Sequence, residues 1–525
     1  MSPTRFCRAQ RRIAAGFAVF AFTLTMMLAA ARPAAAEINY AISFARPDNH
    51  SFQVTMTVPV GKSDVMVAMP AWNALYEIRD FAYRVHSLFI LDPNGAASLI
   101  PDELDKQTWR LCRCASMKER PRAVTLQYSI DWNDPGPFNS QLNDHHAFLN
   151  LAEVLMYEPD RRSEPVEVEF KDVPADWKLI AELRPGPDPN SFVAPNYDAL
   201  VDAPVEAGKF SEFEFDEDSA HFRVAVDGKS YDEGRLEDYL KRITDYEMHL
   251  MGGAPFREYT FLLHLGSIAD VGGGGMEHAN STAISAHSWD GLESLCAHEF
   301  FHAWNVKRIR PQTFEPVDYT KEQYTRALWF AEGVTSTYAS YALVRTGLWS
   351  KAEFYDDLAS QISDLQSRPA RNWQSVEDAS VDTWLDKYAA YNDANRSISY
   401  YGKGQILGVM LDLAIRDATD NHKSLDDVMR LMNDEYAKRA KFYNGDTAIR
   451  AAVETVAGRD FNDFFRRYVA GVDEIPYNKF LALAGLELKS NGTKDREVYS
   501  IAEAPQATER QMKIRTGMLR GTTDR

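Results

Sequence analysis

The sequence predicts an α+β protein of several domains, in which a β-sandwich-like N-terminal domain precedes a mainly helical domain. Between residues 37 and 195, short runs of alternating polar and apolar residues, such as Ser51–Val58, are separated by Asn, Gly and Pro. Beyond about residue 200 the apolar residues recur at helical spacing instead. At 525 residues the chain is also too long for one ordinary core.

The first 36 residues are typical of a secretory signal peptide. Four arginines precede an apolar run, Ile13–Ala31, and three alanines end at Ala36. We therefore expect cleavage after Ala36 and export of a bacterial protein to the periplasm or the medium. The alternative is an uncleaved membrane anchor, because the run is nearly long enough to span a bilayer. The Arg11-Arg12 pair is only a weak indication of twin-arginine export.

The mature protein is predicted to be strongly acidic. The whole chain has a formal net charge of −18, and removal of the leader takes away five arginines and no acid. Nucleic acids and anionic membranes carry phosphate charge that such a surface repels. We therefore expect no nucleic acid and, after leader cleavage, no membrane among the partners. Nothing in the sequence indicates the oligomeric state.

Three cysteines would follow the leader, an odd number that implies no disulfide framework. Cys112 and Cys114 are close enough for a local disulfide or for half of a metal site. Two thiols without further Cys or His at zinc-site spacing are more often inert, so inert thiols are the favoured expectation. Cys296 lies in an apolar stretch and is expected to be a small buried hydrophobic residue.

A passage rich in Pro, Asp and Asn at residues 184–204 marks a linker or a domain edge, and we place the boundary near residue 200. The mature chain is thus divided into a β-rich N-terminal domain, a second domain and a C-terminal tail, at residues 37–200, 201–488 and 489–525. The tail is polar and irregular, and it is too short to form a core of its own.

The second domain is expected to begin with a helix over residues 234–250, stopped by Gly252-Gly253, and a strand over residues 259–265. A glycine run follows at 272–275, and a second extended stretch at 276–286. No Lys-Ser/Thr follows the glycines, so they indicate close backbone approach to a ligand, or flexibility, rather than a nucleotide loop.

Three motifs of the capping-box type predict the helices that come next. D-x-x-E at 290–293 predicts a helix running toward Val306. T-x-x-Q at 320–323 predicts a second helix, which ends near Gly347, and S-x-x-E at 350–353 predicts a third. Apolar periodicity predicts more helices near residues 404–417, 424–439 and 460–470.

The strongest chemical signal is H-E-x-x-H at His298–His302, inside the first of these helices. Residues four apart share one helix face, so both imidazoles can bind one ion while Glu299 lies beside a metal-bound water. We therefore predict His298 and His302 as metal ligands and Glu299 as the general base.

Glu332 is the predicted third ligand, because catalytic zinc commonly has three protein ligands and one open position. It is embedded among apolar residues, where an unpaired carboxylate would be costly; the alternative is a solvated or salt-bridged acid. One Zn²⁺ held in this way polarises a carbonyl and lowers the pKa of its water to about 7, which indicates metal-assisted amide hydrolysis. Co²⁺ and Mn²⁺ suit the same ligands, but zinc is favoured.

Around these residues the sequence resembles the glycyl aminopeptidase family of zinc peptidases, which are gluzincins. The likeness is carried by HEFFHAWNVKRIRP at His298–Pro311 and LWFAEGVTSTY at Leu328–Tyr338. It extends to YDALVDAPVEAGKF within Phe192–Phe215, to Pro70–Val85 and to Ala147–Pro159, and so covers most of the mature chain. The resemblance implies that residues 201–488 form a thermolysin-like, mainly helical zinc peptidase domain acting on a peptide substrate.

The resemblance also implies two further site residues. Gly274–His278 is similar to the element whose carboxylate binds the free α-amine of the substrate in related aminopeptidases, which gives that role to Glu277. Tyr400–Gly404 resembles the segment that steadies the tetrahedral oxyanion, which points to Tyr401. Without the family, Glu277 reads as an ordinary strand-edge acid and Tyr401 as an ordinary packed tyrosine.

These features imply an exported aminopeptidase that removes small N-terminal residues such as Gly or Ala. A zinc endopeptidase is the alternative, in which Glu277 does not close the cleft. A third possibility is a catalytically silent periplasmic binding protein that retains the zinc fold. Structural zinc sites, however, have four protein ligands and no poised base, unlike the set predicted here. The family usually carries a C-terminal PDZ domain, but the residues after Leu488 are too few for one, so we expect none in this sequence.

Overall fold

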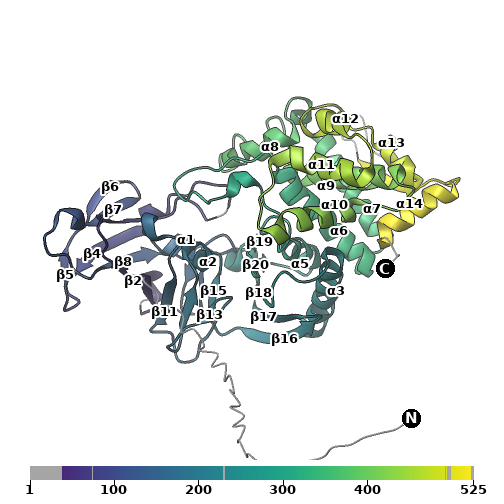
Figure 1. The fold of residues 1–525 in the computed structure, drawn as a ribbon. Helices are drawn as coiled ribbons and strands as arrows, with labels where there is room; N and C mark the ends of the chain where they lie inside the picture. Colours follow the sequence, from purple (N-terminus) through teal and green to yellow (C-terminus); the bar gives the residue numbers. More distant parts are fainter. Residues whose placement is uncertain are drawn as a thin grey trace, which may run out of the picture. The chain divides into compact units, whose positions relative to one another are not determined.

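A computed structural model describes residues 38–45, 47–73, 75–228, 231–490, 492 and 498–521 (Figure 1). The predicted leader and its cleavage site lie outside the described residues. Within the described residues, no helix is both long enough and apolar enough to cross a membrane.

Period-two alternation builds the largest sheet of the N-terminal domain. In β2 (Ser51–Pro59) every second side chain from Phe52 to Val58 is buried. β2 pairs antiparallel with β1 (Ile38–Ser43) and with β8 (Ala123–Asp131), so these buried rows lie side by side. The sheet order is β13-β14-β11-β1-β2-β8-β4-β5, with the other strands at Arg184–Pro185, Ser191–Ala194, Val166–Lys171, Val85–Leu91 and Ala97–Leu99.

A second layer covers the buried face of this sheet. The hydroxyls of Tyr40, Tyr128 and Tyr197 donate to the backbone oxygens of Met156 (2.8 Å), Val154 (2.8 Å) and Leu155 (2.7 Å). The same hydrophobic core includes side chains of two smaller sheets, so the β-sandwich-like N-terminal domain is confirmed. Their strands are β3 (Val65–Ala68), β7 (Thr108–Cys112) and β6 (Asp102–Asp105), and β12 (Lys178–Ala181), β15 (Val205–Gly208), β10 (His146–Leu149) and β9 (Gln141–Leu142).

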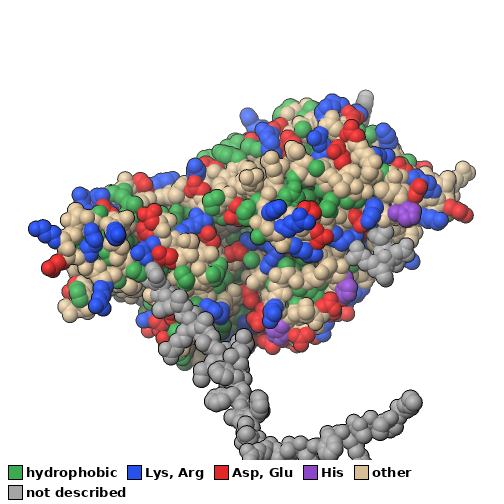
Figure 2. Space-filling model, in the orientation of Figure 1, with side chains coloured by type: hydrophobic (Ala, Val, Ile, Leu, Met, Phe, Trp, Pro, Cys, Tyr) green, Lys and Arg blue, Asp and Glu red, His purple; other side chains and the backbone are tan. Residues whose placement is uncertain are grey.

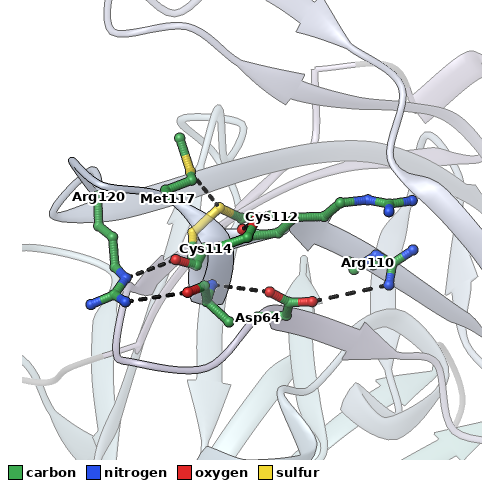
Figure 3. Close-up of a disulfide and its surroundings, with 9 residues drawn as sticks. Asp64, Arg110, Cys112, Cys114, Met117 and Arg120 are labelled. Carbon is green, nitrogen blue, oxygen red and sulfur yellow. Dashed lines mark hydrogen bonds and ion pairs between the residues drawn. A yellow bond between two sulfur atoms is a disulfide. The ribbon is translucent and has the colours of Figure 1, made fainter.

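Cys112 and Cys114 form a disulfide at the end of β7, so the expectation of inert thiols is wrong (Figure 3). The backbone around the bridge is held by side chains. Arg120 donates to the Cys114 carbonyl (2.7 Å), and Asp64 accepts from the Ala115 amide (3.0 Å). These contacts fix the backbone at and just after Cys114. Cys296 is a buried free thiol, as expected.

A mixed five-stranded sheet opens the second domain in the order β16-β17-β18-β20-β19. β17, β18 and β20 run parallel, and the edge strand β19 runs antiparallel to β20. The stretch predicted at 276–286 is therefore a hairpin with a turn at 278–280. Figure 1 shows α3 and α5 beside this sheet. The strands are Ser211–Glu217, Ala220–Gly228, Glu258–Leu265, Ser281–Ala286 and Gly274–Glu277, and the two helices are Glu233–Met251 and Leu292–Phe301.

The first predicted helix is present as α5, but it begins after Gly291, whose φ is 81°, without a side-chain cap, and it ends at Phe301, short of Val306. The second predicted start is wrong. Residues 320–327 are not helical, because the Gln323 side chain accepts from the Asp318 amide (2.9 Å) and closes a loop instead. The helix that follows, α6 (Thr335–Thr346), ends at Gly347 as predicted.

The third predicted start is confirmed, because Ser350 and Glu353 form a capping box at the start of α7 (Lys351–Ser367). The mainly helical character of the second domain is also confirmed. Its remaining longer helices are α8 (Val376–Asp382), α9 (Tyr400–Ala418), α10 (Leu425–Glu435), α11 (Gly445–Ala457) and α14 (Glu509–Arg520).

The described part of the chain after Leu488 packs on the helical domain. The hairpin of β21 (Leu486–Ser490) and β22 (Tyr499–Glu503) precedes α14, in which Ile514 and Met518 are buried. These two side chains belong to the same core as the helices, so the segment adds to an existing core. On the face drawn in Figure 2, acidic, basic and hydrophobic side chains are interspersed.

Candidate active site

Helix α5 brings the two predicted histidine ligands together. His298 and His302 lie four residues apart on the helix, with ring centroids separated by 4.6 Å. Their Nε2 atoms are only 3.0 Å apart. The two rings therefore present their Nε2 atoms to one point.

Glu332 approaches the same point from a wider π-helical turn, Trp329–Val334, that precedes α6. Such turns occur often at functional sites, because they displace one side chain from the regular helical positions. The Glu332 Oε2 atom lies 3.4 Å from Nε2 of His298 and 3.2 Å from Nε2 of His302. Burial raises the pKa of Glu332, but the charge of His302 and hydrogen bonds from both histidines outweigh this and lower it well below its usual range.

This donor set fits one Zn²⁺ ion. Nδ1 of His302 lies 2.6 Å from the Asn305 carbonyl, so Nδ1 donates its proton there and Nε2 is free to bind an ion. Burial lowers the pKa of His302, but the negative charges of Glu332, Glu277 and Glu299 raise it to about 10. The space between these side chains therefore favours a positive charge. Tetrahedral zinc with bonds of about 2.0–2.1 Å keeps its ligand atoms roughly 3.3 Å apart, close to the three separations here.

Glu299 lies beside these ligands on α5. It is buried, and its Oε2 atom has no hydrogen-bond partner among the described residues. Burial, together with the charges of Glu277 and Glu332, raises the pKa of Glu299 well above its usual range, although His302 opposes this. A carboxyl group with an unpartnered oxygen at this place is suited to accept a proton from water.

Strand β19 crosses directly over the Glu299 carboxyl group. A Cβ atom on Gly275 would lie 2.4 Å from the Cδ atom of Glu299, which is closer than any side chain tolerates. The glycine run thus does provide a close backbone approach, but at this position the approach is to the predicted base. The absence of a side chain on Gly275 leaves room for that base.

Glu277 ends β19 and faces the same region. One of its carboxylate oxygens lies within 4.8 Å of ligand atoms of Glu299 and His302. The turn that follows is held on both sides: Arg308 donates to the Ala279 carbonyl (2.8 Å), and Asp202 accepts from the Ala279 amide (3.0 Å). Two charged side chains therefore fix the turn that positions Glu277.

Tyr401 lies at the start of α9, which packs tightly against the turn that carries Glu332. A Cβ atom on Gly333 would lie 2.5 Å from the Gly404 Cα atom, so the two segments meet through glycines. The Tyr401 ring centroid is 6.0 Å from that of His298, and its side chain is 41% exposed. The phenol is therefore open to a ligand beside the histidines.

One cavity of about 780 Å³ contains all six predicted site residues in its lining. Tyr76 and Phe138 of the N-terminal domain also line it, so both domains contribute to its wall. The predicted residues are His298, Glu299, His302, Glu332, Glu277 and Tyr401.

Comparison with known families identifies the chain. Residues 39–209 match the Peptidase M61 N-terminal domain, and residues 292–407 match the M61 glycyl aminopeptidase domain. The chain belongs to the M61 glycyl aminopeptidase family. This M61 chain is therefore a metallopeptidase, a hydrolase of peptide bonds. A search of curated protein sequences found no match.

One solved structure among those similar to this chain shows the same two-domain fold. An aminopeptidase N family protein from Idiomarina loihiensis is 27% identical, with a TM-score of 0.80 over 86% of this M61 chain and 79% of that chain. An M1 zinc metallopeptidase from Deinococcus radiodurans, 17% identical, has a TM-score of 0.49 over 84% and 95% of the two chains. Aminopeptidase A from Legionella pneumophila, 14% identical, has a TM-score of 0.46 over 83% and 49%.

Three residues around the ligands of this M61 peptidase were missed by the sequence analysis. Asn305 accepts from His302, Ser336 Oγ lies 3.3 Å from Nδ1 of His298, and the Tyr76 hydroxyl donates to Oε1 of Glu332 (3.4 Å). All three lie in strings that resemble the family, and that was the only available signal. Contacts of this kind, made to the ligand side chains and not to the ion, orient the ligands.

Proposed function

We propose that this M61 peptidase is a zinc aminopeptidase that removes a small N-terminal residue, Gly or Ala, from a peptide. The observation that carries the proposal is the position of Glu277, within 4.8 Å of ligand atoms of Glu299 and His302. A carboxylate there pairs with the free α-ammonium group of the substrate and closes one end of the cavity. The preference for small residues is supported by the description of the family as glycyl aminopeptidases.

The side chains at the site divide the reaction between them. Zinc bound by His298, His302 and Glu332 would polarise the peptide carbonyl and acidify a water molecule. Glu299 accepts the proton of the attacking water and delivers it to the leaving amine. The Tyr401 phenol donates a hydrogen bond to the oxygen on which negative charge develops.

The proposal is tested with matched peptides that carry either a free or an N-acetylated Gly or Ala. We expect cleavage of the free-amine peptides alone, and a loss of kcat/KM of about 10- to 100-fold in Glu277→Gln, because a charged hydrogen bond is lost. Glu293→Gln on α5, outside the cavity lining, is the matched control.

Equal cleavage of the acetylated peptides would instead assign the site to an endopeptidase. Bound zinc without any turnover would assign the chain to the binding-protein class.

We further propose that the protein is exported and that its leader is cleaved after Ala36. The proposal is supported by the arginine-rich, apolar, alanine-terminated leader and by the Cys112–Cys114 disulfide, since disulfides persist mainly in oxidising compartments. Expression of the full chain in a bacterium and N-terminal sequencing of the periplasmic fraction is expected to give Glu37 as the first residue. A full-length, membrane-bound product would indicate an uncleaved anchor.

A further inference from the structure

A second group of two histidines and one glutamate lies outside the catalytic cavity. It consists of His146, Glu206 and His264, and one ligand atom of each lies within 4.8 Å of the other two. All three are buried, with 8%, 2% and 4% of their surfaces exposed. The M61 mechanism described above uses none of them.

The three residues come from strands of two different sheets. His146 and Glu206 lie on the paired strands β10 and β15, and His264 lies on β18. Asp227, which is next to His264 across the β17–β18 pair, adds a second carboxylate. The cluster therefore joins a sheet of the N-terminal domain to the sheet that precedes α5.

Glu206 connects the two histidines. Its Oε1 atom lies 3.0 Å from Nδ1 of His146, and its Oε2 atom lies 2.9 Å from Nε2 of His264. The second carboxylate, Asp227, has an oxygen 3.6 Å from the same Nδ1 atom. The cluster has the same two-histidine, one-glutamate composition as the catalytic set, but Glu206 meets each histidine with a different oxygen, whereas one oxygen of Glu332 faces both catalytic histidines.

The hydrogen bonds of His146 identify which ring nitrogen lacks a proton in the neutral form. That nitrogen, Nδ1, is the one that faces Glu206 and Asp227. Gln141 donates through its Nε2 atom to Asn133 (3.1 Å), so its Oε1 atom is left to accept from Nε2 of His146 (3.0 Å). In the neutral ring, Nδ1 then carries a lone pair and faces two carboxylate oxygens, which are acceptors only. That arrangement requires either a proton between them, on the ring or on a carboxyl group, or a metal ion.

We propose that His146 Nδ1, His264 Nε2 and Glu206 bind a second divalent cation of the zinc type, with Asp227 beside His146. The ion would lie between the two sheets and outside the catalytic cavity, which indicates a structural rather than a catalytic role. The amide oxygen of Gln141 accepts a hydrogen bond from Nε2 of His146 and so orients the ring with Nδ1 toward the acids. The Asp227 side chain is 40% exposed and gives the ion a route from solvent. The bound ion links the two sheets.

The test uses the full chain with His298→Ala and His302→Ala, which removes the catalytic donors so that only the second site is counted. After chelation and dialysis, this double variant is titrated with Zn²⁺, and bound metal is measured by mass spectrometry. We expect one ion per chain, a higher melting temperature with zinc, and two imidazole ligands at about 2.0–2.1 Å by X-ray absorption.

Addition of His146→Gln to the double variant is expected to abolish this binding and the thermal shift, whereas His422→Gln, at a surface histidine, is the matched control and leaves both unchanged. If the double variant fails to fold, His146→Gln in the otherwise unchanged chain is expected to lower the metal content from two ions to one. Absence of zinc from the double variant, or retention of it after His146→Gln, would overturn the proposal and leave a proton as the cation.

Discussion

Replacement of Glu299 by Gln is expected to lower kcat by roughly 10²- to 10⁴-fold, the usual contribution of a general base, while zinc remains bound. The amide keeps the shape of the side chain but cannot accept the proton of the attacking water. Glu299 is buried and has an oxygen without a hydrogen-bond partner, so a neutral side chain is not expected to destabilise the fold. The measurement is kcat on free glycyl and alanyl peptides, together with the metal content.

The control for this variant is Glu293→Gln, which changes an acid on the same helix outside the cavity lining. It is expected to keep wild-type kcat. If Glu299→Gln kept zinc and full turnover, Glu299 would not be the base. Loss of zinc from Glu299→Gln would show instead that this carboxyl group supports the ligands.

The second large effect is expected from a single methyl group added at Gly275. In Gly275→Ala the new Cβ atom would lie 2.4 Å from the Glu299 carboxyl carbon, well inside van der Waals contact. Either the β19 strand or Glu299 must move, and a displacement of about 1 Å in a catalytic group costs roughly 10²-fold in rate. We expect that loss in kcat with zinc retained.

Gly273→Ala is a closely matched control, because a Cβ atom on Gly273 meets no heavy atom within 4 Å. It is expected to retain wild-type kcat, and both variants are compared by circular dichroism and melting temperature. Unchanged activity in Gly275→Ala would mean that β19 does not fix the position of Glu299. Equal losses in the two variants would mean that flexibility of the glycine run, rather than the contact, is what matters.

The sequence predicted those parts of the site that depend on local geometry. Helical spacing alone brings His298 and His302 to one face, because residues four apart overlie each other on any α-helix. The cost of burying a carboxylate among apolar residues then indicated Glu332. Glu277 and Tyr401 depended on the family resemblance, and the structure brings all six residues into one cavity.

Helix starts were less predictable, for a physical reason. The pairs Thr320/Gln323 and Ser350/Glu353 both offer a hydroxyl group and a side-chain acceptor oxygen, yet of these two pairs only Ser350 and Glu353 cap a helix. Gln323 accepts from the Asp318 amide and stabilises a loop instead. A polar side chain satisfies a loop amide as readily as a helical one, so the motif by itself does not decide between them.

Composition and periodicity determined the fold class, the order of the two domains and the positions of the α5 ligands, because each of these depends on residues close together in the chain. Only the tertiary structure decided that Tyr76 contacts Glu332, that Gly275 lies over Glu299, and that His146, Glu206 and His264 meet. These contacts join residues that are far apart in the chain or lie on different elements. They depend on how sheets and helices pack, which no local pattern specifies.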